Sequence, residues 1–241
     1  MSALPGTTGR RRIYLMRHGH VDYFAPEVVE ASDPTLARLT QQGREQASAA
    51  GQALSAIPFD IALCSGLLRT RQTAELVLDW QAGRDLTLEE DWDLEELRSG
   101  QFIPFESREQ LAATMTFYFE NAPNEGATFF EGGELFADAQ IRAQAAITRL
   151  IHRPGWSNAL VVAHEGINRL LLSWFCNAEL DATVSFEQDT GCINILDVDL
   201  IHEGDSSKIE RKLIKAVNLT PLNYEKHGMN LRSVEAIFDR T

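Results

Sequence analysis

The stretch Ile13-Tyr14-Leu15-Met16-Arg17-His18-Gly19 predicts the architecture of this chain. Its first half is an apolar run typical of a buried β-strand, and its second half places an arginine, a histidine and a glycine where that strand ends. In open α/β sheets, binding sites form at the carboxyl ends of the strands. Histidine offers a neutral nitrogen nucleophile near neutral pH, and arginine matches the oxygens of a phosphate group. A histidine after a strand is also common as a capped or partly buried surface residue, so the rest of the chain has to decide between the two interpretations.

Strand-like and helix-like segments alternate along the rest of the chain. After the strand at 12–16, apolar runs predict further strands at 60–64, 159–163, 192–200 and 209–217. Helical patterns fall at 43–56, 67–80, 105–120, 134–152 and 166–177. In the segment 134–152 the apolar stripe is expected to run through Ile141, Ala145, Thr148 and Ile151. Repeated strand–helix units predict an α/β fold, a three-layer sandwich in which a mainly parallel central sheet carries helices on both faces.

The chain is expected to form a single domain over residues 11–241. Residues 1–10 form a flexible tail in this interpretation, because its first nine residues are small or polar and lack an apolar core. A C-terminal extension is expected from about residue 219. The stretch 121–133 is rich in glycine and contains a proline, which indicates a loop and not a domain boundary.

Composition limits the function classes that need to be considered. Of the 241 residues, 44% are hydrophobic and 24% are charged, as in ordinary globular proteins. Cys64, Cys176 and Cys192 lie in apolar segments without metal-ligand spacing, so we expect buried thiols in a reducing compartment. No apolar stretch approaches the length of a transmembrane helix, so neither a membrane partner nor a membrane location is expected. A cytoplasmic location is expected.

The net charge of −13 argues against nucleic acid as a partner. An acidic surface does not attract an anionic substrate, so a local cationic pocket has to do so. The densest acidic run, residues 89–96, is expected to be mostly a solvated face.

Chemically useful side chains follow three of the predicted strands. Arg17 and His18 follow the first, Arg69 comes shortly after the second, and His164 follows the third. Taken singly, Arg69 would be an exposed helix residue and His164 a histidine near the core. Because the carboxyl ends of parallel strands meet at one edge of a sheet, the threefold repetition instead predicts a cationic site there.

These residues resemble the histidine phosphatase superfamily, also called the phosphoglycerate-mutase-like family. Five motifs of that family occur in its order between residue 13 and about residue 200. They are Arg17-His18-Gly19; Leu39-Thr40 with Gly43 and Gln46-Ala47; Ser65 with Leu67, Arg69 and Gln72-Thr73-Ala74; Leu94 with Glu96 and Gly100; and Val161-Val162-Ala163-His164-Glu165-Gly166.

The resemblance implies a role for each of five residues. His18 would be the nucleophile that takes up the phosphoryl group, and Arg17, Arg69 and His164 would hold the phosphate oxygens. Glu96 would be the general acid that protonates the leaving oxygen. Phosphoryl transfer needs positive charge around three equatorial oxygens, which two arginines and a second histidine supply. No metal ion and no cofactor are therefore expected.

Some positions depart from the family pattern. Members often carry Glu or Gln, then Thr or Ser, and later Asn after Arg-His-Gly, whereas this chain has His20, Val21 and Phe24. His20 either replaces one of these substrate contacts or faces solvent. Glu165 stands where many members have glycine, and either lies near the pocket, where it deters highly anionic substrates, or points away. The aromatic-rich region 102–119 would lie above the pocket mouth in the family fold, so substrate choice is expected to arise there.

The leading functional hypothesis is a metal-independent phosphatase that hydrolyses a small phosphomonoester through a phosphohistidine. A phosphoglycerate-type mutase and a non-catalytic binding protein on the same fold are the alternatives. A metallohydrolase is disfavoured, because Asn168 stands where the zinc motif that His164-Glu165 begins needs a second histidine. Glu95 competes with Glu96 for the role of acid, and the glycine at position 100 favours Glu96. A small phosphorylated substrate is the expected partner, and the sequence is compatible with a homodimer.

Overall fold

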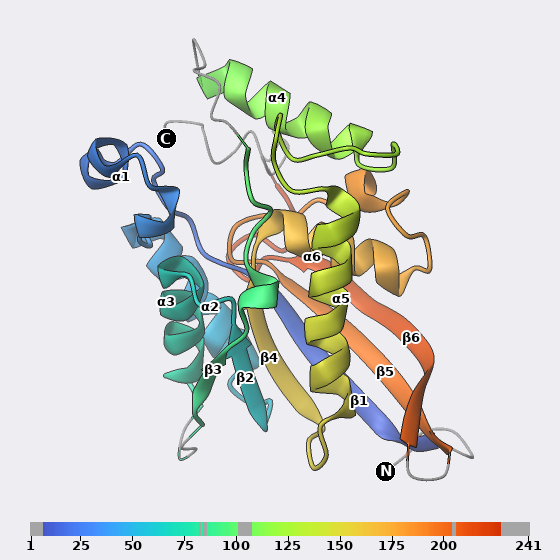
Figure 1. The fold of residues 1–241 in the computed structure, drawn as a ribbon. Helices are drawn as coiled ribbons and strands as arrows, with labels where there is room; N and C mark the ends of the chain where they lie inside the picture. The colour runs from blue at the N-terminus through green and yellow to red at the C-terminus, as the bar shows by residue number, and fades with distance from the viewer. Residues whose placement is uncertain (1–6, 82, 84–85, 101–107, 204–205, 228–241) are drawn as a thin grey trace.

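In the described part of the chain, six strands form one sheet in the order β3-β2-β4-β1-β5-β6. The computed structural model describes all residues except 1–6, 82, 84–85, 101–107, 204–205 and 228–241 (Figure 1). The strands are β1 (Thr7–Arg17), β2 (Ile61–Cys64), β3 (Leu88–Glu90), β4 (Asn158–Ala163), β5 (Ile193–Glu203) and β6 (Ser206–Leu219). The helices are α1 (Pro26–Ala31), α2 (Gln41–Leu54), α3 (Leu68–Leu78), α4 (Arg108–Asn121), α5 (Phe136–His152) and α6 (Glu165–Phe175), with 3-10 turns η1 (Pro34–Leu36), η2 (Trp92–Leu94) and η3 (Thr183–Ser185). None of the described helices combines the length and the apolar character that a membrane span requires.

The sheet is mixed. Strands β3, β2, β4 and β1 run parallel to one another, as predicted for the main part of the sheet. β5 pairs antiparallel with β1 on one side and with β6 on the other. The short connection from Glu203 to Ser206 explains the second pairing, because it permits only a hairpin. β3 was not predicted, since its three residues carry no apolar run. The parallel half of the sheet is the half in which the predicted polar strand ends lie.

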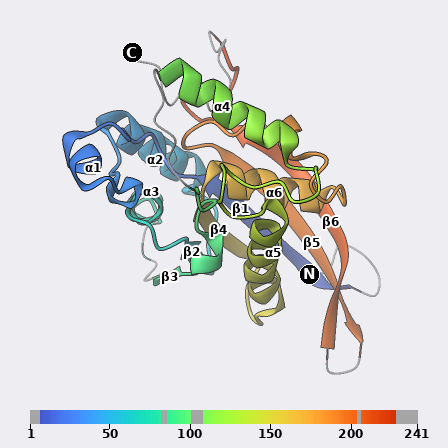
Figure 2. The same cartoon turned by 45° about the horizontal axis from the view of Figure 1, so that its top comes forward.

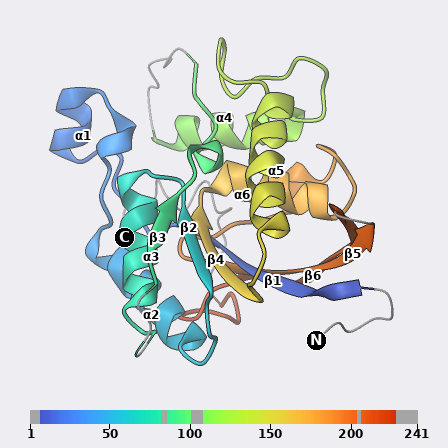
Figure 3. The same cartoon turned by 60° about the horizontal axis from the view of Figure 1, so that its bottom comes forward.

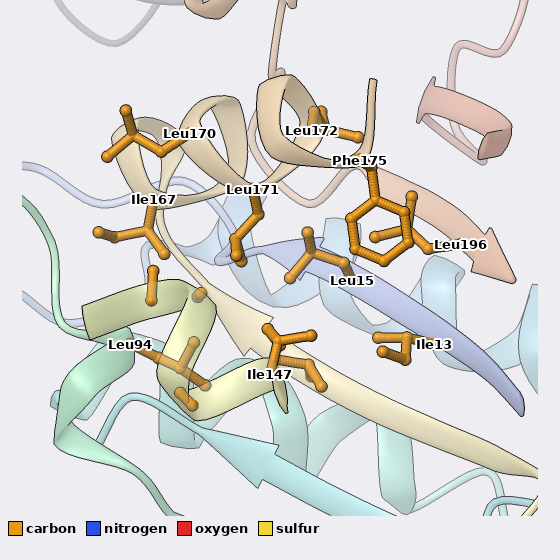
Figure 4. Close-up of a cluster of buried hydrophobic side chains, with 14 of the residues drawn as sticks. Ile13, Leu15, Leu94, Ile147, Ile167, Leu170, Leu171, Leu172, Phe175 and Leu196 are labelled. Carbon is orange, nitrogen blue, oxygen red and sulfur yellow. The ribbon is translucent and has the colours of Figure 1, made fainter. Parts of the chain in front are cut away.

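Helices cover both faces of the sheet, which confirms the three-layer prediction. In Figure 3, α2 and α3 lie on one side of the sheet and α5 and α6 on the other. Side chains of β1 alternate between these layers: Tyr14 and Met16 pack with α2 and α3, whereas Ile13 and Leu15 pack with α5 and α6. Figure 4 shows Leu15 beside Leu171 and Phe175 of α6, within the cluster of apolar side chains that forms this second layer. Each such burial stabilises the fold by roughly 1.5–3 kcal/mol.

The buried stripe of α5 differs from the predicted one. The buried face of the helix consists of Phe136, Ala139, Gln140, Ala143, Ala146, Ile147, Leu150 and Ile151. Ile141 is 65% exposed, so the predicted stripe was wrong apart from Ile151. Both stripes are apolar, and tertiary packing selects the one with the larger side chains, Phe136, Ile147 and Leu150.

The N-terminal tail is shorter than predicted. β1 begins at Thr7 and pairs with β5, so residues 7–10 are strand and not tail. Polar residues in this part of β1 form cross-strand ion pairs with β5. Arg10 Nε lies 2.9 Å from Asp199 Oδ1, and Arg12 Nε lies 2.6 Å from Asp197 Oδ1. At the other end of the chain, Lys226 of the C-terminal extension forms an ion pair with Asp189 of the main domain. Residues 228–241 lie outside the described part.

Two surface expectations also need comment. Cys64 and Cys192 are buried as expected, but Cys176 is exposed, because it follows the last turn of α6. The acidic run lies at the surface as expected, but arginines pair with most of it. The pairs are Glu89 with Arg153, Glu90 with Arg71, Asp91 and Asp93 with Arg149, and Glu95 with Arg98.

α4 lies at the end of the molecule where α1 also lies, beyond α6 (Figures 1 and 2). The aromatic side chains of this helix do not share one role: Phe119 is buried, whereas Phe117 is 62% exposed. Phe102 and Phe105 of the same predicted region lie outside the described residues.

Candidate active site

Three parallel strands bring the predicted side chains to one edge of the sheet. β1 and β4 pair so that Arg17 lies opposite Ala163. His18 and His164 follow these two residues directly, and their ring centroids lie 5.2 Å apart. Ser65 follows β2, which pairs with β4 on its other side. The histidines, far apart in sequence, are therefore direct neighbours.

The turn that carries His18 lies closely against the first turn of α2. A Cβ atom on Gly19 would lie 2.4 Å from the carbonyl oxygen of Gly43, and one on Gly43 would lie 2.2 Å from that of His20. Only glycine permits this approach. The Gly19 N–H donates to Thr73 Oγ1 at 3.1 Å, and the His20 N–H donates to Gln46 Oε1 at 2.8 Å. The second and third sequence motifs thus hold the turn of His18 in place.

The hydrogen bonds of His18 decide which of its nitrogens can react. Nδ1 lies 2.8 Å from the carbonyl oxygen of Gly19, which can only accept, so Nδ1 carries the proton in the neutral ring. The lone pair is then on Nε2. Burial, followed by the charges of Arg69 and Arg17, lowers the pKa of His18 well below its ordinary value. The His18 ring is therefore kept neutral, and its Nε2 has the free lone pair that a nitrogen nucleophile requires.

His164 is the first member of a chain of hydrogen bonds. Thr70 Oγ1 donates to the Leu67 carbonyl at 2.7 Å, so Ser65 Oγ, 2.9 Å away, donates to Thr70. His164 Nε2, 2.7 Å from Ser65 Oγ, must then be the donor to Ser65. Burial, and then the charge of Arg69, lowers the pKa of His164 well below its ordinary value. An anion at Nδ1 would favour the charged ring, which has a second N–H to donate.

Three buried nitrogens of the site have no hydrogen-bond partner among the described residues: Arg17 Nε, Arg69 Nε and His164 Nδ1. Arg17 Nε and Arg69 Nε are donors, and His164 Nδ1 becomes one when its ring is charged. A buried donor without an acceptor costs about 1–3 kcal/mol, and native proteins rarely leave several in one place. An oxyanion supplies the acceptors that such a set needs. The set therefore fits a phosphate group.

Arg69 stands against an aromatic side chain. Its guanidinium carbon lies 5.7 Å from the centre of the Tyr23 ring, and its Nη1 donates to the carbonyl of Pro34 at 3.4 Å. Tyr23 is half-buried in the loop between the turn of His18 and α1. An aromatic surface thus adjoins one of the two arginines of the site.

Glu165 fits neither of the two predicted alternatives in full. It is near the pocket, but both of its oxygens are engaged: Oε2 lies 2.8 Å from Arg17 Nη1, and Oε1 lies 2.8 Å from Arg169 Nη2. All three side chains are buried. Glu165 therefore holds one end of the Arg17 guanidinium and leaves Nε for a ligand. Arg169 was missed by the sequence analysis, although its position four residues after Glu165 on a helix was a signal for the pair.

Glu165→Gln is expected to lower the free energy of unfolding by roughly 3–5 kcal/mol, because it leaves the buried Arg17 and Arg169 without their shared counter-charge. Guanidinium denaturation measures this loss. Glu187→Gln is the matched control: Glu187 is 43% exposed and 3.7 Å from Arg169, so its loss should cost no more than about 1 kcal/mol. Equal costs for the two variants would contradict the assignment.

The carboxyl group of Glu96 lies against the N-terminus of α6, the helix that begins directly after His164. Its Oε2 accepts from the Gly166 N–H at 3.2 Å, and its Oε1 accepts from the N–H groups of Leu97 and Ile167 at 3.0 and 3.3 Å. A Cβ atom on Gly166 would lie 2.7 Å from Oε1, so glycine makes room for this carboxyl group. Burial raises the pKa of Glu96 above its ordinary value, against the opposite effect of these N–H groups. The group is thus suited to carrying a proton.

His20 does not simply face solvent. Its Nδ1 lies 2.9 Å from Oγ1 of Thr40, the residue that caps α2. Burial, and then the charge of Arg17, lowers the pKa of His20. His20 therefore stands beside the site, held by the helix that supports the turn of His18. No cluster of metal-ligating side chains occurs among the described residues.

Comparison with known proteins places this geometry in a family. Residues 13–204 match the histidine phosphatase superfamily (branch 1), and the chain belongs to it. The chain is 31% identical over 197 residues to an adenosylcobalamin/alpha-ribazole phosphatase of Salmonella typhimurium, which covers 78% of this chain and 90% of that protein. It is also 31% identical over 173 residues to 2-carboxy-D-arabinitol-1-phosphatase of Triticum aestivum, covering 70% of this chain and 33% of that protein. The match to the family and the phosphatases among its relatives identify the chain as a phosphatase of the superfamily.

Mutases are also among its relatives. The chain is 28% identical over 220 residues to a 2,3-bisphosphoglycerate-dependent phosphoglycerate mutase of Bartonella bacilliformis, covering 86% of this chain and all of that protein. Among solved structures, a putative alpha-ribazole-5'-P phosphatase of Escherichia coli has a TM-score of 0.63 at 24% identity and covers 86% of this chain and 96% of its own. That likeness supports the fold.

Proposed function

We propose that this phosphatase hydrolyses a small phosphomonoester through a phosphohistidine on His18, without a metal ion. The observation that carries the proposal is the hydrogen bond from His18 Nδ1 to the Gly19 carbonyl, which leaves the lone pair on Nε2 of a ring beside the charges of Arg69 and Arg17. The unpartnered nitrogens of Arg17, Arg69 and His164 support the same assignment, because they suit phosphate oxygens.

The proposed reaction has two displacements. In the first, Nε2 of His18 attacks phosphorus, the bond from phosphorus to the leaving oxygen breaks, and Glu96 gives its proton to that oxygen. In the second, water attacks the phosphohistidine, the N–P bond breaks to return neutral His18, and phosphate leaves with the protons of the water. Solvent returns a proton to Glu96. Arg17, Arg69 and His164 stabilise the charge on the phosphoryl oxygens in both steps.

The proposed substrates are phosphomonoesters with an aromatic or apolar alcohol portion. Adenosylcobalamin/alpha-ribazole phosphatases are among its relatives, and alpha-ribazole is a nucleoside with an aromatic base. Tyr23 adjoins Arg69, and the half-buried Phe24 stands where many members of the family carry a polar residue. A sugar-acid phosphate would find fewer polar partners at these two positions, which favours hydrolysis over the mutase reaction.

A substrate panel tests this proposal. It contains alpha-ribazole 5'-phosphate, 2-carboxy-D-arabinitol 1-phosphate, 3-phosphoglycerate and p-nitrophenyl phosphate, each with and without excess EDTA. We expect release of inorganic phosphate, the highest kcat/KM for alpha-ribazole 5'-phosphate, and no effect of EDTA. Conversion of 3-phosphoglycerate to its 2-isomer faster than any hydrolysis would establish a mutase instead, and loss of activity in EDTA would overturn the metal-independent mechanism.

We further propose that the protein works in the cytoplasm without a nucleic-acid or membrane partner. The strong negative charge and three cysteines outside any disulfide support this setting. Sedimentation velocity distinguishes a monomer from the homodimer that the sequence allows.

A further inference from the structure

Arg142 on α5 uses every donor of its guanidinium group. Nε donates to Glu134 Oε1 at 2.6 Å, and Nη2 donates to Glu134 Oε2 at 2.7 Å. Nη1 donates to the carbonyl oxygens of Asp93 and Glu95 at 2.8 and 2.7 Å, and Nη2 also donates to the carbonyl of Glu96 at 3.2 Å. A guanidinium group has five N–H donors, so all five are satisfied here.

Three of the five acceptors are main-chain carbonyls of the segment that carries the proposed acid. We infer that Arg142 is a positioning residue for Glu96, an inference that rests on the role proposed above for Glu96. Arg142 acts through the backbone on both sides of the acid: Glu134, its ion-pair partner, also accepts from the Arg98 N–H at 3.1 Å. The segment is thus held just before and just after the carboxyl group.

The acid needs such support because its segment is not part of a regular element beyond η2. Glu95 has left the 3-10 turn, with backbone angles of −57° and 149°, and no helical or sheet ladder follows directly. A planar fork that binds three carbonyls fixes the position of a backbone in a way that a lysine ammonium cannot. A displacement of about 1 Å in a catalytic group can lower the rate by about 10²-fold.

The chain offers a matched control on the same helix. Arg149, seven residues later, contacts the same segment, but only through the carboxylates of Asp91 and Asp93, at 2.9 and 2.7 Å. Its side chain is 53% exposed, so these ion pairs should contribute little. Loss of Arg149 removes positive charge next to the segment without removing a main-chain hydrogen bond.

The test compares two leaving groups in the full chain. Arg142→Met and Arg149→Met are assayed on p-nitrophenyl phosphate, whose leaving group needs no acid, and on an alkyl phosphomonoester, whose leaving group does. We expect Arg142→Met to lower kcat on the alkyl ester by about 10²-fold and on p-nitrophenyl phosphate by less than about threefold. Arg142→Lys should remain impaired on the alkyl ester, and Arg149→Met should leave both rates unchanged.

Arg142→Met leaves the Glu134 carboxylate without its partner, which can prevent folding. The double variant Arg142→Met, Glu134→Gln removes that unpaired charge and is assayed in the same way if the single variant does not fold. Equal losses on the two substrates, or no loss, in the folded variant would overturn the inference. Glu96→Gln, assayed in parallel, separates this from a failure of the proposed function. If Glu96→Gln is selective for the alkyl ester and Arg142→Met is not, only the inference fails; if Glu96→Gln is itself unselective, the acid role of Glu96 fails.

Discussion

His18→Asn is expected to lower kcat by at least about 10⁴-fold, on the scale seen when a covalent nucleophile is removed. Asparagine keeps an N–H that can donate to the Gly19 carbonyl, as Nδ1 does now, so the turn should persist. It offers no nucleophile in place of Nε2. The measurement is acid-labile, base-stable label on the protein after rapid mixing with a ³²P-labelled phosphomonoester, since that lability distinguishes phosphohistidine from phosphoserine.

The matched control for this experiment is His20→Asn, the same substitution two residues further along. His20 is held by Thr40 and takes no part in the two displacements, so this variant should still acquire label. Label on the His18→Asn protein, or label on His164 in the unmodified protein, would contradict the assignment of the nucleophile.

Glu96→Gln is expected to lower kcat on an alkyl phosphomonoester by about 10²–10⁴-fold, the range of general acid catalysis, and to change turnover of p-nitrophenyl phosphate far less. Glutamine has no proton to give, and only the alkyl leaving group needs one. Glu95→Gln is the control, because Glu95 pairs with the exposed Arg98 at the surface. A similar loss on both substrates would rule out Glu96 as the acid.

The pH dependence of kcat/KM follows from the same two groups. The lowered pKa of His18 keeps its reactive neutral form present as the pH falls below the usual range of histidine. The raised pKa of Glu96 keeps its proton present as the pH rises above the usual range of a carboxyl group. The kcat/KM for an alkyl phosphomonoester should therefore fall on the alkaline side, when Glu96 loses its proton. The profile for p-nitrophenyl phosphate, whose leaving group needs no acid, should lack that alkaline limb, and the same limb on both substrates would contradict the assignment.

Much of the fold could be predicted because its signals are local. The apolar runs of β1, β2 and β4 are continuous, as expected for strands buried on both faces, and the helices between them indicated parallel pairing. β3 and the first residues of β1 carry no such run. Their pairing is decided by neighbours in space. β3 pairs with β2, and Arg10 and Arg12 of β1 pair with aspartates of β5.

The sequence by itself determined which residues meet at the proposed catalytic site, because the motif at Arg17-His18-Gly19 and its counterpart at His164 lie where parallel strands must end. Only the tertiary structure decided how those residues are held. Glu165 meets Arg17 from a position 148 residues away in the chain, and Arg142 reaches the carbonyls around Glu96 across 46 to 49 residues. Such contacts have no period and no spacing rule, because they depend on which side chains the packed helices bring together.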